Sequence, residues 1–369
     1  MHRPWLHPEA VHSDSGAWHL GRRPALDGLR GFAILLVLMS HAGSWSADAR
    51  DFAMVGNAGV TLFFTLSGFL ITALLIEERQ RTRRVDLTAF YGRRVRRLLP
   101  AFLVFLPLAG APLVVQHRWP DLVGVVFYVG NWIRAAGGVP LLGLSHTWSL
   151  SIEEQFYLVW PIAFLFSARW RRGPVVVAVA GVAASLAATV VLFLHGASVD
   201  RLYFGTDTRA VALLAGCLLA FAAPHLPELR SRAVVYLGCG VLAGSALAVT
   251  RETRLEDALA PTLVAALSVV LIWGATSHTS GPLTRPAARY LGVRSYGLYL
   301  WHYPVLLLFY AGLGNHLDVT VMALVAAVGV TELSWRLVET RFLVRRPRRA
   351  EAYVEIGATE PGRPLGSTP

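Results

Sequence analysis

The sequence predicts an all-α membrane protein, a polytopic bundle of transmembrane helices. Of its 369 residues, 54% are hydrophobic and only 15% are charged, and the mean hydropathy is +0.50. A soluble domain carries nearer a quarter charged residues. Apolar stretches approaching the roughly 20 residues that a helix needs to cross a bilayer recur along most of the chain. Both observations indicate the same class of protein.

About ten apolar stretches predict membrane-spanning helices, because a backbone inside hydrocarbon must satisfy its own hydrogen bonds. They lie at residues 26–44, 58–76, 98–115, 150–168, 174–195, 207–223, 233–249, 258–276, 290–313 and 318–343. We therefore expect a mobile N-terminal tail at 1–22, a transmembrane domain at 23–343 and a disordered C-terminal tail at 344–369. Since no hydrophilic run is long enough for a soluble catalytic domain, any chemistry is expected inside the bundle.

A weaker stretch at residues 122–137 is interrupted by glycines and by Arg134. With ten spans, most arginines between the spans fall on one side of the membrane. The other side receives only Arg50, Arg118, Arg134, Arg201, Arg251 and Arg254. This bias places both termini in the cytoplasm. A full crossing by 122–137 would reverse every later loop, so we expect this stretch to be re-entrant or interfacial.

Composition argues against metal and nucleic-acid partners. Cys217 and Cys239 lie in separate apolar stretches, where packing is the expected role, and no metal site is expected. The net charge of +11 comes from arginines beside apolar spans. That arrangement sets orientation and attracts anionic membrane lipids, so no nucleic-acid partner is expected.

The first span places a cation and an imidazole on one face. Arg30 and His41 are eleven residues apart, so on a helix they point within about 20° of each other and lie roughly 16 Å apart along the axis. Ionisable residues at membrane depth indicate a functional site. The alternatives are an Arg30 that only extends to the membrane surface and a His41 that only bonds a neighbour.

The second span, Gly59–Thr72, is interrupted by small and hydroxyl-bearing residues. They are Thr61, Thr65, Ser67, Gly68 and Thr72. Small residues let another helix or an extended ligand approach the backbone closely. Helix packing and substrate lining explain them equally well.

Four arginines lead into the third span, within Phe90–Pro100. They are Arg93, Arg94, Arg96 and Arg97. Anionic lipid head groups and topology account for such a cluster. A ligand that carries several phosphates accounts for it equally, because arginine binds phosphate through two hydrogen bonds.

Two later stretches line up polar and aromatic residues on one helix face. In Ser145–Pro161, Ser149, Glu153 and Trp160 follow helical spacing, with Tyr157 on the same face. Aromatic rings beside a carboxylate suit sugars or other polyols. Glu153 and Glu154 near a helix N-terminus are also favourable for the helix dipole, an explanation that covers Glu154 better than Glu153. In Arg294–Pro304, the residues at i, i+4 and i+7 are Ser295, Tyr299 and His302.

Five motifs in order resemble the acyltransferase type 3 family of polytopic membrane acyltransferases. They are LDGLRG with His41 following Arg30 at the Arg-x10-His spacing, LFFTLSGFLIT, FYGRRVRRLLP, HTWSLSIEEQFYLVWP and SYGLYLWHYP, and the match runs from Arg23 to Phe342. The family modifies sugars, envelope polymers, lipids and natural products. The resemblance implies a multi-pass plasma-membrane O-acyltransferase that uses cytoplasmic acyl-CoA, by default acetyl-CoA. Some relatives carry an added esterase-like domain, and we expect the membrane unit to act without one here.

The resemblance and the residue pattern together give a mechanistic hypothesis. The essential Arg and His of the family map onto Arg30 and His41, and its Arg-x-x-Arg pair onto Arg94 and Arg97. His41 is the expected general base or, alternatively, an acyl-carrying nucleophile, and Glu153 would orient His41 or the acceptor. The donor phosphates are assigned to Arg93, Arg94 and Arg97, and the acceptor to Ser149, Tyr157, Trp160, Tyr299 and His302.

The sequence does not identify the acceptor. A saccharide, a lipid-linked glycan and a secondary metabolite each offer a hydroxyl that suits an aromatic-lined pocket. The competing class is a transporter or flippase, since many spans with buried histidines also suit alternating access. An arginine-rich mouth favours a phosphorylated donor over a small solute. An inactive relative that serves as a scaffold is a third reading.

Overall fold

The computed structural model describes residues 20–21, 23–45, 55–139, 141–229, 231–248, 254–278 and 280–343. Apart from residues 20 and 21, the two predicted tails at 1–22 and 344–369 lie outside the described residues. Within the described ranges every regular element is a helix and no β-strand occurs. The prediction of an all-α fold is therefore confirmed for this part of the chain.

The helices follow one another with short connections. In chain order they are α1 (Pro24–Trp45), α2 (Val55–Thr82), α3 (Leu87–Val115), α4 (Trp119–Val126), α5 (Gly130–Ala135), η2 (Leu142–Thr147), α6 (Trp148–Ser167), α7 (Gly173–Leu194), α8 (Val199–Phe204), α9 (Thr206–Ala222), η3 (Ala223–His225), α10 (Arg232–Ala248), α11 (Arg254–Ser277), η4 (Pro282–Thr284), α12 (Pro286–Val293), α13 (Ser295–Leu313), α14 (Leu317–Ser334), η5 (Trp335–Glu339) and α15 (Thr340–Leu343). η2, η3 and η4 are 3-10 helices, and η5 is a π-helical turn.

Seven helical stretches are long and apolar enough to cross a membrane. They are Pro24–Gly43, Gly56–Thr82, Leu87–Val115, Gly173–Leu194, Val199–His225, Ala258–Ser277 and Leu317–Leu343. The other three predicted spans also coincide with helices, namely α6, α10 and the α12–α13 pair. Two of these, α6 and α13, carry the polar residues singled out from the sequence, which lowers their hydropathy. The chain is thus a multi-pass membrane protein, while the number of ten spans and the side of the termini stay predictions.

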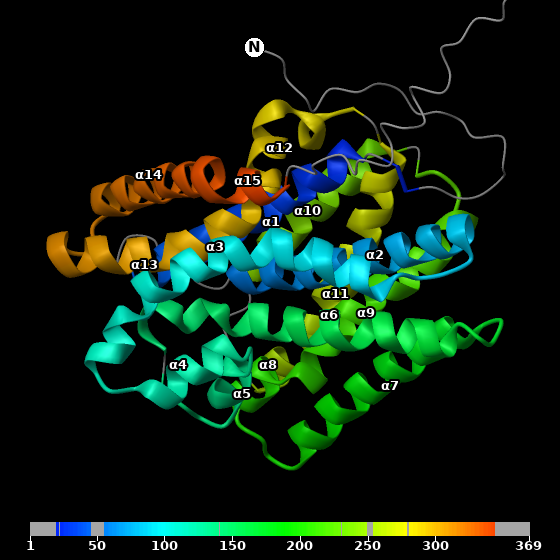
Figure 1. Cartoon of the computed structure of the whole chain (residues 1–369), viewed down its shortest axis with the longest axis horizontal. Coiled ribbons are helices and arrows are strands. Elements are labelled where there is room, and N and C mark those ends of the chain that lie inside the picture. The colour runs from blue at the N-terminus through cyan, green and yellow to red at the C-terminus, as the bar shows by residue number, and fades with distance from the viewer. Residues whose placement is uncertain are drawn as a thin grey trace, which may run out of the picture.

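The first helix lies inside the bundle. Figure 1 shows α13 and α14 side by side along one edge and α7 along the opposite edge, with α1 and α2 between them. α1 packs on α2, α12 and α13, and α2 packs on α9 and α11. Large apolar side chains on α7, such as Val176, Val190 and Leu194, are exposed, as expected for a surface that faces lipid. α1 is therefore placed to combine residues from both sides of the bundle.

Glycines allow the close helix contacts around α1 and α2. A Cβ atom at Gly28 would lie 1.9 Å from the Leu283 carbonyl oxygen, and one at Gly292 would lie 1.7 Å from that of Asp27. Between α2 and α9, a Cβ at Gly68 would lie 1.8 Å from the Leu213 oxygen. These distances are too short for any side chain, so the glycines bring the backbones into contact.

The small residues of the second span divide between packing and polar contacts. Gly68 serves packing, and Thr61 and Thr65 donate to carbonyl oxygens one turn earlier on their own helix. Ser67 and Thr72 instead reach side chains of α6, namely Glu153 and Trp160. All of these contacts belong to helix packing, and substrate lining by this stretch stays a prediction.

The interrupted stretch at 122–137 folds as two short helices. α4 has eight residues and α5 has six, so each rises only about 9–12 Å. A closed ring of hydrogen bonds fixes α5: Gln155 donates to Asn131 at 3.0 Å, Asn131 donates to Thr206 at 2.9 Å, and Thr206 donates back to Gln155 at 2.6 Å. The broken backbone is thereby held against α6 and α9. Its position relative to the membrane stays a prediction.

We expect Gly68→Ala to lower the thermal stability of the protein. The added Cβ would meet backbone rather than a movable side chain, and overpacking of this kind costs about 1–3 kcal/mol. Gly240→Ala is the matched control, because no atom lies within 4 Å of its added Cβ. Thermal unfolding in detergent measures both, and equal melting temperatures would contradict this account of the α2–α9 contact.

Candidate active site

The polar face of α1 lies against the polar face of α13. At one level Arg30 donates from Nε and Nη2 to Ser295 Oγ, over 3.3 and 3.2 Å. Eleven residues further along α1, His41 Nδ1 lies 2.9 Å from His302 Nε2. Ser295 and His302 are seven residues apart, two turns of α13, so they share a face. The helical spacing of both motifs thus brings four predicted site residues together as two pairs.

His302 is the group that meets His41. Its ring is fully buried, its centroid lies 5.0 Å from that of His41, and its Nδ1 lies 2.8 Å from the Leu298 carbonyl oxygen. The expectation that Glu153 orients His41 is not reproduced by the geometry, because no bond joins them among the described residues and Glu153 bonds elsewhere.

A third histidine, His146, completes the cluster. It sits on η2 with its ring centroid 5.4 Å from that of His302, and its Nε2 lies 3.2 Å from the Leu300 carbonyl oxygen. The Tyr303 ring lies 4.9 Å from His41 and 5.0 Å from His146. Sequence reasoning did not assign His146 a role, because it precedes α6 on a 3-10 turn and so falls outside the helical spacing of that motif. Its place in the same motif as Ser149 was the available signal.

Ser149 and Tyr299 connect α6 to α13 beside the histidines. Tyr299 Oη donates to the carbonyl oxygen of His146 over 2.6 Å, and Ser149 Oγ lies 2.5 Å from the same phenol. Because the Tyr299 proton is directed at the carbonyl, Ser149 is the donor in the second bond. Tyr299 lies one turn before His302 on α13, and its bond to Ser149 ties that helix to α6.

Glu153 belongs to a separate polar line that leads toward the arginines. Ser67 donates to its carboxylate over 2.7 Å, and Tyr157 donates to Ser67 over 2.9 Å. The guanidinium of Arg94 stacks on the Tyr157 ring, 3.5 Å from its centroid. This line joins α2, α3 and α6.

Tyr157 and Trp160 do not reach the histidines. Trp160 is buried and donates to Thr72 over 2.9 Å, and Tyr157 is occupied by Ser67 and Arg94. On α6 the shared face advances about 1.5 Å per residue, so Trp160 lies roughly 10 Å beyond Glu153, away from His146. Helical spacing put Tyr157 and Trp160 on one face with Ser149, but the structure places them at another depth than His41, and their role in acceptor binding stays a prediction.

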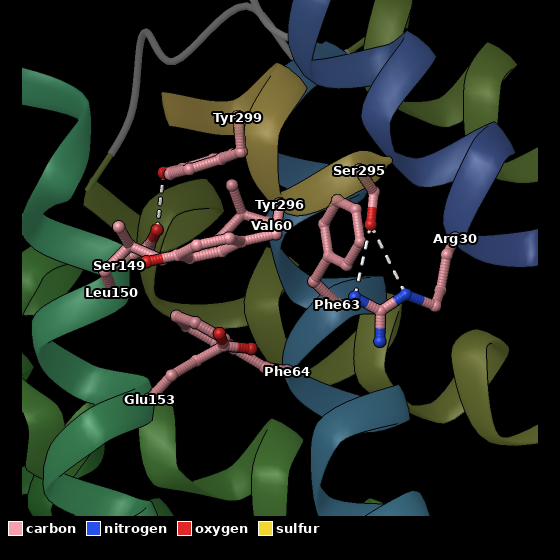
Figure 2. A pocket seen from close by; sticks show the side chains of 10 residues that line it. All are labelled: Arg30, Val60, Phe63, Phe64, Ser149, Leu150, Glu153, Ser295, Tyr296 and Tyr299. Atoms are coloured by element: carbon pink, nitrogen blue, oxygen red, sulfur yellow. Dashed lines mark hydrogen bonds between the residues drawn. The ribbon is translucent and has the colours of Figure 1, made fainter. Parts of the chain in front are cut away.

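A pocket lies between the line that contains Glu153 and the polar residues of α1 and α13. Its empty space, including the part open to solvent, is about 390 Å³, and Figure 2 shows Arg30 and Ser295 on one wall with Ser149, Glu153 and Tyr299 on the other. Val60, Phe63, Phe64, Leu150 and Tyr296 complete the lining. The pocket reaches Tyr299, one turn of α13 before His302. A thin chain with both polar and apolar parts fits such walls.

The three arginines assigned to donor phosphates lie in different surroundings. Arg93 is half exposed and pairs with Glu78 over 3.5 Å, while Arg97 is exposed. Arg94 Nε and Nη2 are buried and have no hydrogen-bond partner among the described residues. Of the three, Arg94 therefore has the donors most in need of an anion. No group of three or more His, Cys, Asp and Glu side chains in the described ranges is placed to hold a metal ion.

Fold and site together define a polytopic membrane protein with a histidine pair and a pocket inside its helical bundle. The acyltransferase domain family matches residues 23–337. The chain therefore belongs to the acyltransferase type 3 family, a family of membrane acyltransferases, as the five motifs indicated. This assignment gives no support to the transporter or flippase alternative.

The chain is also similar to named O-acetyltransferases. Peptidoglycan O-acetyltransferase OatA of Listeria monocytogenes is 32% identical over 358 residues, covering 86% of this chain and 55% of the relative. O-acetyltransferase OatA of Staphylococcus aureus is 31% identical over 348 residues, covering 86% and 56%. The chain thus spans just over half the length of these relatives. No solved structure matches it.

We expect the Ser149–Tyr299 contact to be energetically coupled. Tyr299→Phe leaves the buried His146 carbonyl and the Ser149 hydroxyl without this partner, at a cost of about 1–3 kcal/mol. Ser149→Ala added to Tyr299→Phe should cost clearly less than the sum of the single substitutions. Thermal unfolding of the two single variants and the double variant measures the coupling. Strictly additive losses would show that the bond contributes nothing.

Proposed function

We propose that this protein is a membrane O-acyltransferase that moves an acyl group, by default acetyl, from cytoplasmic acyl-CoA to a hydroxyl of an acceptor at the outer face. The observation that carries the proposal is the His41–His302 pair. It lies one turn beyond a pocket that Arg30 lines, and the chain belongs to a family of acyltransferases. The pair supplies a base, and the pocket supplies a route to it.

The arginines at the mouth are the proposed phosphate ligands. Acyl-CoA carries several phosphates on a long, thin arm that ends in a thioester. The unpartnered N–H groups of Arg94 suit a phosphate oxygen, and Arg97 stands one turn away on the same helix. Arg93 is the weakest of the three assignments, because Glu78 already neutralises part of its charge. The arm would then pass Glu153 and Arg30 through the pocket.

His41 is the proposed general base. The acceptor hydroxyl gives its proton to His41 while its oxygen attacks the thioester carbonyl. The new C–O ester bond forms, the C–S bond breaks, and the proton passes from His41 to the sulfur, so the products are an ester and free CoA thiol. General-base assistance of this kind contributes about 10²–10⁴ in rate.

The acceptor is proposed to be a saccharide of the cell envelope. The support comes from the relative whose name is peptidoglycan O-acetyltransferase. The histidine cluster adds to it, since His41 and Tyr303 are partly exposed beside the fully buried His302. A lipid-linked glycan and a secondary metabolite are the alternative acceptors. Mass spectrometry of envelope glycans and secreted metabolites, from cells with and without the protein, distinguishes the three.

We expect His41→Ala to bind acetyl-CoA as tightly as the wild type does and to transfer no acetyl group. Arg94→Ala should instead weaken acetyl-CoA binding, because it removes the buried phosphate donors. Arg96→Ala is the matched control: it removes one exposed charge of the same cluster. Calorimetric titration with acetyl-CoA measures binding, and isotope-labelled acetyl-CoA measures transfer. Full transfer by the His41 variant would overturn the mechanism.

A further inference from the structure

The hydrogen bonds of His302 determine which nitrogen of each histidine carries a proton. His302 Nδ1 lies 2.8 Å from the Leu298 carbonyl oxygen. A carbonyl oxygen only accepts hydrogen bonds, so this Nδ1 must carry the hydrogen. A neutral imidazole carries a single N–H, and Nε2 of His302 is therefore the nitrogen with the free electron pair.

The same reasoning extends to His41. His302 Nε2 is 2.9 Å from His41 Nδ1. Since Nε2 of the neutral His302 only accepts, His41 Nδ1 must be the donor. Neutral His41 then carries its free electron pair on Nε2. We infer that His302 is a positioning residue that holds His41 as the Nδ1–H tautomer, so that the base in acyl transfer is His41 Nε2. This inference rests on the proposed function.

Two of the three titratable groups beside the pair direct their hydrogens elsewhere, and the Val37 carbonyl, which also hydrogen-bonds the His41 ring, only accepts. The groups that face the pair are His146, Tyr299 and Tyr303. His146 directs its Nε2 hydrogen at the Leu300 carbonyl oxygen, and Tyr299 directs its hydroxyl at the His146 carbonyl oxygen. The Tyr303 ring centroid is 6.3 Å from that of His302 and packs edge-on against His41.

The pair also accommodates the charge that forms during the reaction. When His41 Nε2 takes the acceptor proton, its Nδ1–H faces the electron pair of His302 Nε2. That hydrogen can move to His302, whose Nδ1–H already faces the Leu298 oxygen. The positive charge is then shared by two hydrogen-bonded rings instead of being isolated in an apolar site, where a lone charge is costly. In histidine-based triads a carboxylate fixes the tautomer, and here a neutral imidazole takes that place.

Two substitutions of similar size separate positioning from packing. His302→Gln can place an amide oxygen where Nε2 was, and this oxygen accepts from His41. His302→Asn can keep a donor to the Leu298 oxygen but is too short to reach His41. We expect kcat within about 10-fold of the wild type for the Gln variant and a loss of about 10²-fold or more for the Asn variant, with the KM for acetyl-CoA unchanged in both.

The assay uses detergent-purified protein, acetyl-CoA and a muropeptide disaccharide that bears no acetyl ester, with the released thiol and the ester both measured. His195→Asn, at an exposed position, is the control for loss of a histidine. An Asn variant as active as the wild type would overturn the inference. So would a Gln variant as inactive as the Asn variant while both bind acetyl-CoA normally.

A measurement without turnover keeps this inference separate from the proposed function. Protein with ¹⁵N-labelled histidine, compared with the His41→Ala and His302→Gln variants, reports the protonated nitrogen of each ring by NMR. Protonated Nδ1 in both histidines supports the inference, and a protonated Nε2 in neutral His41 overturns it. Absence of acetyl transfer by the wild type to any hydroxyl would instead overturn the proposed function.

Discussion

The hydrogen bond between His41 and His302 depends on how closely α1 approaches α13. Inside a membrane a polar side chain has no water to bond, so each must find a protein partner. Gly31 and Gly292 remove the side chains that would separate α1 from α12, which leads directly into α13. Arg30 then reaches Ser295, and His41 reaches His302. The glycines and the polar residues of these motifs therefore serve one contact.

Two lines of polar residues flank the pocket, and they have different chemistry. The line through Glu153, Ser67 and Tyr157 ends under Arg94, whose buried N–H groups suit an anion. The polar residues of α13 end at the His302 imidazole, which hydrogen-bonds that of His41. The proposed donor, acyl-CoA, carries phosphates at one end and a thioester at the other, in the same order. Glu153 is thereby kept apart from His41, and the proposed role of His302 is to fix the His41 tautomer in place of a carboxylate.

Helix periodicity predicted from sequence alone which polar residues share a helix face. The spacing of Arg30 and His41 gave a shared face, and that of Ser295, Tyr299 and His302 gave the opposing one. The spacing failed where depth mattered: Tyr157 and Trp160 share the face of Ser149 but lie further along the helix, where they bond Ser67 and Thr72. His146 was missed, because a 3-10 turn does not follow the helical repeat.

The sequence by itself determined the class of the protein, because long apolar runs have few ways to satisfy their backbone in a membrane, and its five ordered motifs determined the family. Only the tertiary structure decided which polar groups meet. Partners such as His41 and His302 are 261 residues apart in the chain, and helical periodicity fixes the direction of a side chain within its own helix, not the neighbour opposite. Which groups meet depends on how closely the helix backbones approach one another. Glycines set that distance here, and the sequence does not show which helix each glycine contacts.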